Sequence, residues 1–327
     1  MKKRLIAVIC ICVMIIGCLS ACGSKPENDS ADSGDNLQIV ATIFPVYDWI
    51  RELLGENPAG IELTMLMDSG VDLHSFQPTA TDILRVSSCD MFVYVGGESD
   101  NWVEDAMKEA ANENLKEINL MEILDGDLEE EEIVEGMQPE KKEEEEEEPE
   151  YDEHIWLSLN NASVLCERLA DAIKEMDPEH AEVYETNASA YRQKLTELDD
   201  EYRSEISECP QKTVLFGDRF PFRYLTEDYG LDYYAAFAGC SAETEASFET
   251  ISFLSGKADE LGLGCVLTIE GSDQRIAETI VQNTKEKDQK ILTMDSMQST
   301  TAKDAEKGIS YLSIMESNKE VLREALQ

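Results

Sequence analysis

Short apolar runs alternate with segments of helical period along most of this chain. The alternation covers residues 38–95 and returns after residue 213. It is typical of βαβ units, in which helices connect and cover the strands of a parallel sheet. The first half predicts strands at 38–44, 61–67 and 91–95, a helix at 46–54 and a further short element at 81–87. The second half predicts strands at 213–216, 231–237, 265–269 and 290–294, with helices at 248–261 and 274–285. The pattern predicts an α/β protein with two Rossmann-like lobes.

One long amphipathic segment lies between these two halves. Over 177–206 apolar residues recur every three or four positions, and no Gly or Pro interrupts the period after Pro178. Asp177 is a suitable N-cap, and Pro178 stands at the first helical position. A helix of this length extends on the order of 45 Å. We expect it to join the lobes as a rigid backbone helix, which disfavours a large hinge closure.

The first 22 residues have the three-part pattern of a lipoprotein signal. Residues 2–4 are basic, residues 5–17 are apolar, and the sequence LSAC ending at Cys22 resembles a lipobox. The apolar stretch is shorter than the roughly 20 residues that span a bilayer. We expect cleavage of residues 1–21 and lipidation of Cys22, so that the protein is extracytoplasmic and lipid-anchored at the cell membrane. The alternative is an uncut signal anchor.

The predicted domain organisation follows from these segments. After the signal peptide, a polar tether covers 22–36. The remaining regions are an N-terminal lobe at 37–176, the linking helix at 177–207 and a C-terminal lobe at 208–327. We expect a monomer.

Charge narrows the possible partners. The formal net charge is −43, with 70 acidic and 27 basic residues. Nucleic acid is excluded as a partner because phosphate binding needs a basic surface, whereas metal cations would be attracted. The most acidic stretch, 125–150, has no buried period and predicts a disordered loop within the N-terminal lobe. The loop could serve only solubility, or it could collect cations weakly.

Five cysteines follow Cys22 and include no CxxC pair: Cys89, Cys166, Cys209, Cys240 and Cys265. An odd number argues against a complete disulfide framework. We expect small buried thiols with at most one or two bridges.

The chain has three histidines, and two of them stand in loops among carboxylates. His74 follows a predicted strand, where ligands of doubly wound sheets bind. His154 precedes a predicted helix. His180 lies in the first turn of the long helix, where we expect it to be exposed. Taken singly, His74 or His154 could be an ordinary structural histidine.

Several motifs together resemble the zinc- and manganese-binding lipoproteins of bacterial ABC importers, the cluster 9 or A-I type of solute-binding protein. They are IVATIFPVYDWIRELLG, VDLHSFQPTATDI, DMFVYVGGESDNWVED, DEHIWLSLNNA, DPEHAEVYETNASAYRQKLTELDDEY and KILTMDSM, and the resemblance extends over 37–327. It implies two lobes joined by one backbone helix, with a metal ion in the cleft between them. It also implies that His74 and His154 are ligands from the first lobe and that Asp295 is the carboxylate ligand from the second.

The chain departs from this family at the remaining ligand. Relatives carry His or Glu in the loop that follows the strand at 213–216, where this chain has either Gly217 or Arg219, depending on the alignment. Neither coordinates a cation as the relatives' residue does. Asp218 is the candidate, although it could instead cap the turn or pair with Arg219. The reserves are Glu270, Glu243 and Glu245, and a water molecule is a further alternative.

The donor chemistry supports a cation site without settling the metal. Imidazoles suit zinc and other late first-row ions, and carboxylates accept harder ions such as manganese. The Irving–Williams order puts Zn²⁺ ahead of Mn²⁺. Together with the family resemblance, which implies an ABC permease and its ATPase as partners, this chemistry leads us to expect a non-enzymatic protein that captures Zn²⁺ and presents it to that importer. One alternative is a Mn²⁺-specific importer lipoprotein or adhesin of the same family. A zinc-dependent exported hydrolase is less favoured, because the sequence has neither HExxH nor GxSxG.

Overall fold

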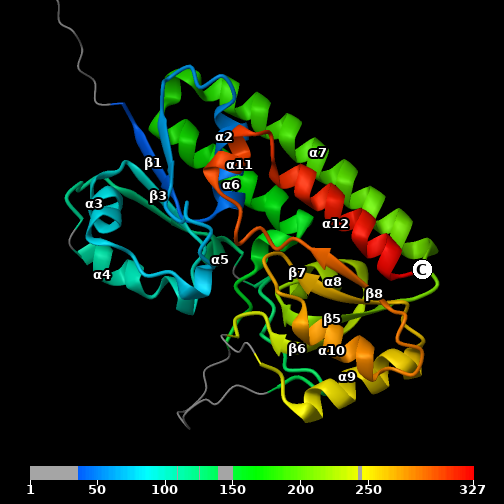
Figure 1. Ribbon diagram of the computed structural model, residues 1–327. Helices are drawn as coiled ribbons and strands as arrows, with labels where there is room; N and C mark the ends of the chain where they lie inside the picture. Colours follow the sequence, from blue (N-terminus) through cyan, green and yellow to red (C-terminus); the bar gives the residue numbers. More distant parts are fainter. Residues whose placement is uncertain (1–35, 109, 125, 139–149, 242–244) are drawn as a thin grey trace, which may run out of the picture. The chain divides into compact units, whose positions relative to one another are not determined.

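Two four-stranded parallel sheets form the framework of the protein (Figure 1). The computed structural model describes residues 36–327 except 109, 125, 139–149 and 242–244. The strand orders are β2-β1-β3-β4 and β6-β5-β7-β8, and every pairing is parallel. In each sheet the first strand pairs with the second on one side and the third on the other, so both halves are wound alike. The predicted fold class is confirmed.

The first sheet and its helices occupy the N-terminal half. The strands are β1 (Gln38–Ala41), β2 (Glu62–Met65), β3 (Met91–Tyr94) and β4 (Lys116–Asn119). The helices are α2 (Phe44–Leu54), α3 (Ala80–Ser88), α4 (Trp102–Lys108), α5 (Leu120–Ile123) and α6 (Leu159–Met176). Single 3₁₀ turns lie at η1 (Leu73–Ser75), η2 (Glu98–Asp100) and η3 (Ile155–Leu157). Two of these turns, η1 and η3, lie beside the histidines singled out in the sequence.

The second sheet follows the same plan. Its strands are β5 (Thr213–Phe220), β6 (Asp232–Ala238), β7 (Cys265–Ile269) and β8 (Lys290–Met294). Its helices are α8 (Arg223–Tyr229), α9 (Phe248–Leu261), α10 (Arg275–Asn283), α11 (Ala302–Glu306) and α12 (Tyr311–Ala325). Strand β5 continues four residues beyond its predicted end, with an irregular register between Phe216 and Arg219. The expected loop after residue 216 is therefore strand. Gly217 suits this place because a Cβ there would lie 2.6 Å from the Cα of Ala277 in α10.

The long helix α7 (Ala181–Glu208) follows a 3₁₀ turn, η4 (Pro178–His180). Its buried stripe packs against α2 and α6 of the first half and against α8 and α12 of the second (Figure 1). Asp177 is the N-cap residue of η4 and Pro178 is its first residue, in the positions expected, but the Asp177 side chain makes no capping bond. Its carboxylate accepts bonds from the Tyr184 hydroxyl (2.6 Å) and from His180 Nδ1 (2.7 Å) instead. These contacts connect Asp177 to the turn and to the first turns of α7.

Part of the predicted acidic loop is ordered in the structure. Within 126–138, Met137 is buried in the core and Gln138 N donates to Ala236 O of β6 at 3.0 Å. Residues 125 and 139–149 lie outside the described residues, as do the signal peptide, Cys22 and the tether up to residue 35. No helix among the described residues is long and apolar enough to span a membrane. The five cysteines after Cys22 are all free thiols, and four of them are buried.

One apolar core cluster includes residues of both sheets, with Trp49, Trp156 and Tyr311 among its largest fully buried members. Tyr311 starts α12 and connects distant segments. Its hydroxyl donates to Trp156 O at 2.7 Å, and its amide donates to Asp48 Oδ2 at 2.7 Å. The turn η3, which contains Trp156, is therefore fixed from the C-terminal helix.

We predict that Tyr311→Phe destabilises the protein by about 1–3 kcal/mol, because the buried Trp156 carbonyl loses its donor. Denaturant unfolding measures the change. The matched control is Tyr151→Phe, at a tyrosine that is 42% exposed, which we expect to change stability by less than about 0.5 kcal/mol. Equal effects of the two substitutions would contradict the anchoring role of Tyr311.

Candidate metal centre

His74 lies in the turn that follows β2, at the carboxyl end of the first sheet. Asp72 caps this turn, because its Oδ1 accepts a hydrogen bond from His74 N at 3.0 Å. The second carboxylate oxygen, Oδ2, accepts from Nη2 of Arg219 at 2.7 Å. Arg219 belongs to β5 of the second half, so this ion pair connects the two halves directly beside the histidine.

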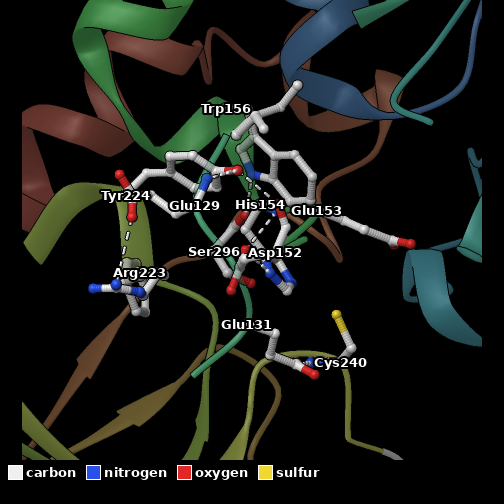
Figure 2. Close-up of polar contacts among 12 residues, drawn as sticks. Glu129, Glu131, Asp152, Glu153, His154, Trp156, Arg223, Tyr224, Cys240 and Ser296 are labelled. Carbon is white, nitrogen blue, oxygen red and sulfur yellow. Dashed lines mark hydrogen bonds and ion pairs between the residues drawn. The ribbon is translucent and has the colours of Figure 1, made fainter. Parts of the chain in front are cut away.

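His154 is fully buried at the start of η3. The Asp152 carboxylate accepts bonds from both the backbone amide (2.8 Å) and ring Nδ1 (2.9 Å) of His154 (Figure 2). A proton on Nδ1 therefore faces Asp152, and Nε2 is left to face the other histidine. The second half supports this segment as well: Tyr224 donates to Asp152 O at 2.9 Å, and Trp156 Nε1 donates to Ser296 O at 2.9 Å.

The two histidines meet through their Nε2 atoms, which lie 3.1 Å apart. Two nitrogens of a tetrahedral zinc site are separated by roughly 3.3 Å when each Zn–N bond is about 2.0–2.1 Å. The pair therefore already has the spacing of adjacent ligands. His74 Nδ1 contacts Ser99 Oγ (2.8 Å) and Glu153 Oε2 (3.4 Å). In each imidazole, Nδ1 thus faces a carboxylate and Nε2 faces the other histidine. Metal sites whose histidine ligands are oriented by outer carboxylates have the same arrangement.

The pKa values of the two histidines shift in opposite directions. Burial, followed by the nearby charge of His154, lowers the pKa of His74 to about 3. Burial also opposes the charged form of His154, but the carboxylates of Asp152, Glu153 and Asp72 together outweigh burial and raise the pKa of His154 above its ordinary value. Without a cation, a proton between the two rings is therefore held more strongly by His154 than by His74.

Cys240 is the third potential ligand at this point, and the sequence analysis missed it. Donor atoms of His74, His154 and Cys240 all lie within 4.8 Å of one another. Cys240 comes two residues after the end of β6, through Gly239. A Cβ on Gly239 would lie 2.8 Å from Cε1 of His154, so glycine allows this backbone to approach the ring. The available signal was a cysteine just beyond the carboxyl end of a predicted strand, the same position that drew attention to His74.

The carboxylates predicted as ligands make other contacts in the structure. Asp295 Oδ1 accepts from Met297 N at 2.7 Å. Asp218 Oδ1 accepts from Arg219 N at 2.9 Å, in keeping with the alternative role considered for it. Glu270 accepts from the amide and hydroxyl of Ser296, both at 2.7 Å. Over the described part of the chain, no group of three mutually close donors includes any of these carboxylates.

The two remaining candidate carboxylates are Glu245, which follows the undescribed residues 242–244, and Glu243, which is one of them. Glu245 is exposed, and its backbone carbonyl accepts from Gln138 Nε2 at 3.5 Å. Glu243 lies outside the described residues. Among the described residues, the donors that lie close enough together to hold a metal ion are thus two histidines and one cysteine.

The comparison with protein families identifies the chain. The family model described as "ZnuA: Zinc-uptake complex component A periplasmic" matches residues 39–325. The chain belongs to the ZnuA family. This confirms the resemblance drawn from the motifs and places the protein among extracytoplasmic binding proteins rather than enzymes. It argues against the exported hydrolase considered as an alternative.

Individual members of the ZnuA family differ in length. "High-affinity zinc uptake system protein ZnuA" of Bacillus subtilis is 28% identical over 323 residues, with 98% of this chain and 96% of that protein covered. "Zinc-binding protein AdcA" of Streptococcus pyogenes is 28% identical over 293 residues, or 88% of this chain and 55% of that protein. The chain therefore spans little more than half the length of AdcA.

A solved structure supports the same assignment to the ZnuA family. The Zn(II)-bound ZnuA-like domain of Streptococcus pneumoniae AdcA superposes with a TM-score of 0.68 at 27% identity, covering 89% of this chain and 99% of that domain. The likeness thus extends over almost all of the described residues.

We predict that Asp152→Asn lowers the pKa of His154 in the metal-free protein, because the substitution removes the largest of the carboxylate contributions that raise this pKa. Titration of the histidine ring by NMR measures the pKa. As a control, Asp105→Asn changes a carboxylate that is 88% exposed and pairs only with Lys108 among the described contacts, so we expect no effect on His154. An unchanged pKa of His154 in the Asp152 variant would contradict this account of its charge.

Proposed function

We propose that this protein captures Zn²⁺ outside the cytoplasm and delivers it to an ABC importer, without catalysing a reaction. His74 Nε2 and His154 Nε2 bind the ion. The observation that carries this proposal is the 3.1 Å approach of Nε2 of the fully buried His154 to Nε2 of the partly buried His74, with the rings oriented by Asp152, Ser99 and Glu153. Zinc is favoured because imidazole nitrogens are its common ligands and because the similar proteins named above are described as zinc-binding or zinc-uptake proteins. Manganese remains the alternative ion.

A carboxylate is expected to complete the coordination of the ion alongside the two histidines. We propose that Asp295 is a ligand from the second half, as the family resemblance implies. Its loop is held near His154 because Trp156 Nε1 bonds to Ser296 O, one residue beyond Asp295. Burial raises the pKa of Asp295, so an approaching cation would stabilise its charged form. Asp218 and Glu270 are less suited, since backbone amides already occupy their oxygens.

Delivery requires the site to open. We propose that contact with the permease and its ATPase shifts a ligand-bearing loop rather than swinging the two halves apart. The long helix α7 packs on helices of both halves, which opposes hinge motion. The turn of His74, by contrast, is short. Its movement requires the ion pair between Asp72 and Arg219 of the second half to break. Lipidation at Cys22 would keep the monomeric binding protein beside its importer.

We predict that His74→Ala and His154→Ala each weaken Zn²⁺ binding by roughly 100-fold or more, because each removes a directly bound nitrogen. Isothermal titration of the metal-stripped protein measures the dissociation constant. His180→Ala is the matched control, since His180 pairs with Asp177 in η4 and belongs to no described ligand group. Binding that survives loss of both His74 and His154 would overturn the proposed function.

We predict that Zn²⁺ affinity falls as the pH is lowered. The pKa of His154 is raised above 6.5, so below that pKa the ion must displace a proton from the ring. Each displaced proton weakens binding by about tenfold per pH unit. Titrations between about pH 7.5 and 5.5 cover the range in which histidine changes charge. A constant affinity across this range would contradict ligation by His154.

A further inference from the structure

We propose that Cys240 is a zinc ligand and that its thiolate makes the site select thiophilic cations over Mn²⁺. This inference rests on the proposed function, because it assigns a third donor to the ion held by His74 and His154. It departs from the sequence prediction, in which every ligand beyond the histidines was an oxygen.

The position of Cys240 is set by the backbone. Strand β6 ends at Ala238, and Gly239 then passes against the ring of His154, with Phe220 O on its other side. A side chain on Gly239 would collide with both, so this approach is available only to glycine. The amide of Cys240 lies 3.5 Å from Glu131 Oε1, within hydrogen-bond range (Figure 2). The close passage of Gly239 past His154 and the bond from the Cys240 amide to Glu131 together hold Cys240 next to His154.

The distances fit a tetrahedral ion after a small adjustment. With Zn–S near 2.3 Å and Zn–N near 2.0–2.1 Å, sulfur and nitrogen ligands are separated by roughly 3.6 Å. The donor atoms of Cys240 and the histidines lie within 4.8 Å. An approach of about 1 Å therefore suffices, which side-chain rotation of a half-buried cysteine can supply.

Burial and the carboxylates of Asp152, Glu131 and Glu153 raise the pKa of the Cys240 thiol, so its thiolate depends on the bound cation for stabilisation. Arg219 brings a positive guanidinium next to the turn of His74, where it neutralises Asp72. Two neutral imidazoles add no negative charge of their own. A bound thiolate at Cys240 supplies a negative charge in direct contact with the cation, while Asp152 and Glu153 act through the rings.

A thiolate also decides which cation is preferred. Sulfur donors select soft or borderline ions such as Zn²⁺ and Cd²⁺, whereas Mn²⁺ favours carboxylate, carbonyl and water oxygens. A site of two imidazoles and one thiolate should discriminate against Mn²⁺ more strongly than a site completed by oxygen. Cys240 would then determine the specificity of the protein.

The test uses the full-length chain purified in detergent and stripped of metal. Co²⁺ serves as the spectroscopic probe, and Zn²⁺ and Mn²⁺ dissociation constants are measured side by side. We expect a sulfur-to-cobalt charge-transfer band in the native protein, loss of that band in Cys240→Ser, and a Zn²⁺-to-Mn²⁺ preference reduced by at least about tenfold in Cys240→Asp. Cys209→Ser, at another free cysteine, is the matched control and should retain the band and the preference. Circular dichroism confirms that each variant is folded.

The outcomes separate the two proposals. If the native protein binds Co²⁺ and Zn²⁺ without the band, or if Cys240→Asp leaves the metal preference unchanged, the inference about Cys240 is wrong while the capture of metal by the histidines stands. If the native protein binds none of the three ions, the proposed function fails as well.

Discussion

The structure of the centre depends on the contact between two imidazoles that are 80 positions apart in the chain. Placing His74 Nε2 and His154 Nε2 3.1 Å apart is unfavourable for two charged rings, and the lowered pKa of His74 keeps that ring neutral. The carboxylate of Asp152 fixes the ring of His154, and Ser99 and Glu153 fix that of His74. The pair is therefore preorganised for a cation, so that little ordering is left to occur on binding.

The surrounding fold supplies this preorganisation from both halves of the protein. Tyr224 of α8 holds the Asp152 backbone, and Tyr311 of α12 holds Trp156, two residues after His154. Arg219 of β5 holds Asp72 beside His74. Both sheets are wound alike, so the carboxyl ends of their strands provide the loops that converge on the site. A centre built between halves in this way can release its ion through local changes in one loop.

Much of the fold was predictable because the spacing of apolar residues along the chain indicates which side of each helix or strand is buried. Helix α9 and strands β7 and β8 begin and end where the pattern placed them. The extension of β5 was not predictable, since Gly217 and Asp218 have low strand propensity, and Gly217 is accommodated by its close packing against Ala277 of α10. The two histidines were found because histidine is scarce here and both stand in carboxylate-rich loops. Cys240 was missed because a single cysteine has no spacing motif, and only the close passage of Gly239 past His154 reveals its place.

The central claim is that one Zn²⁺ binds both His74 and His154. X-ray absorption at the zinc edge, on the protein loaded with one equivalent, tests it most directly. The account predicts zinc–nitrogen distances of about 2.0–2.1 Å with outer-shell scattering from two imidazoles. A spectrum showing oxygen neighbours without imidazole scattering would mean that zinc binds the acidic surface instead, and would contradict the account.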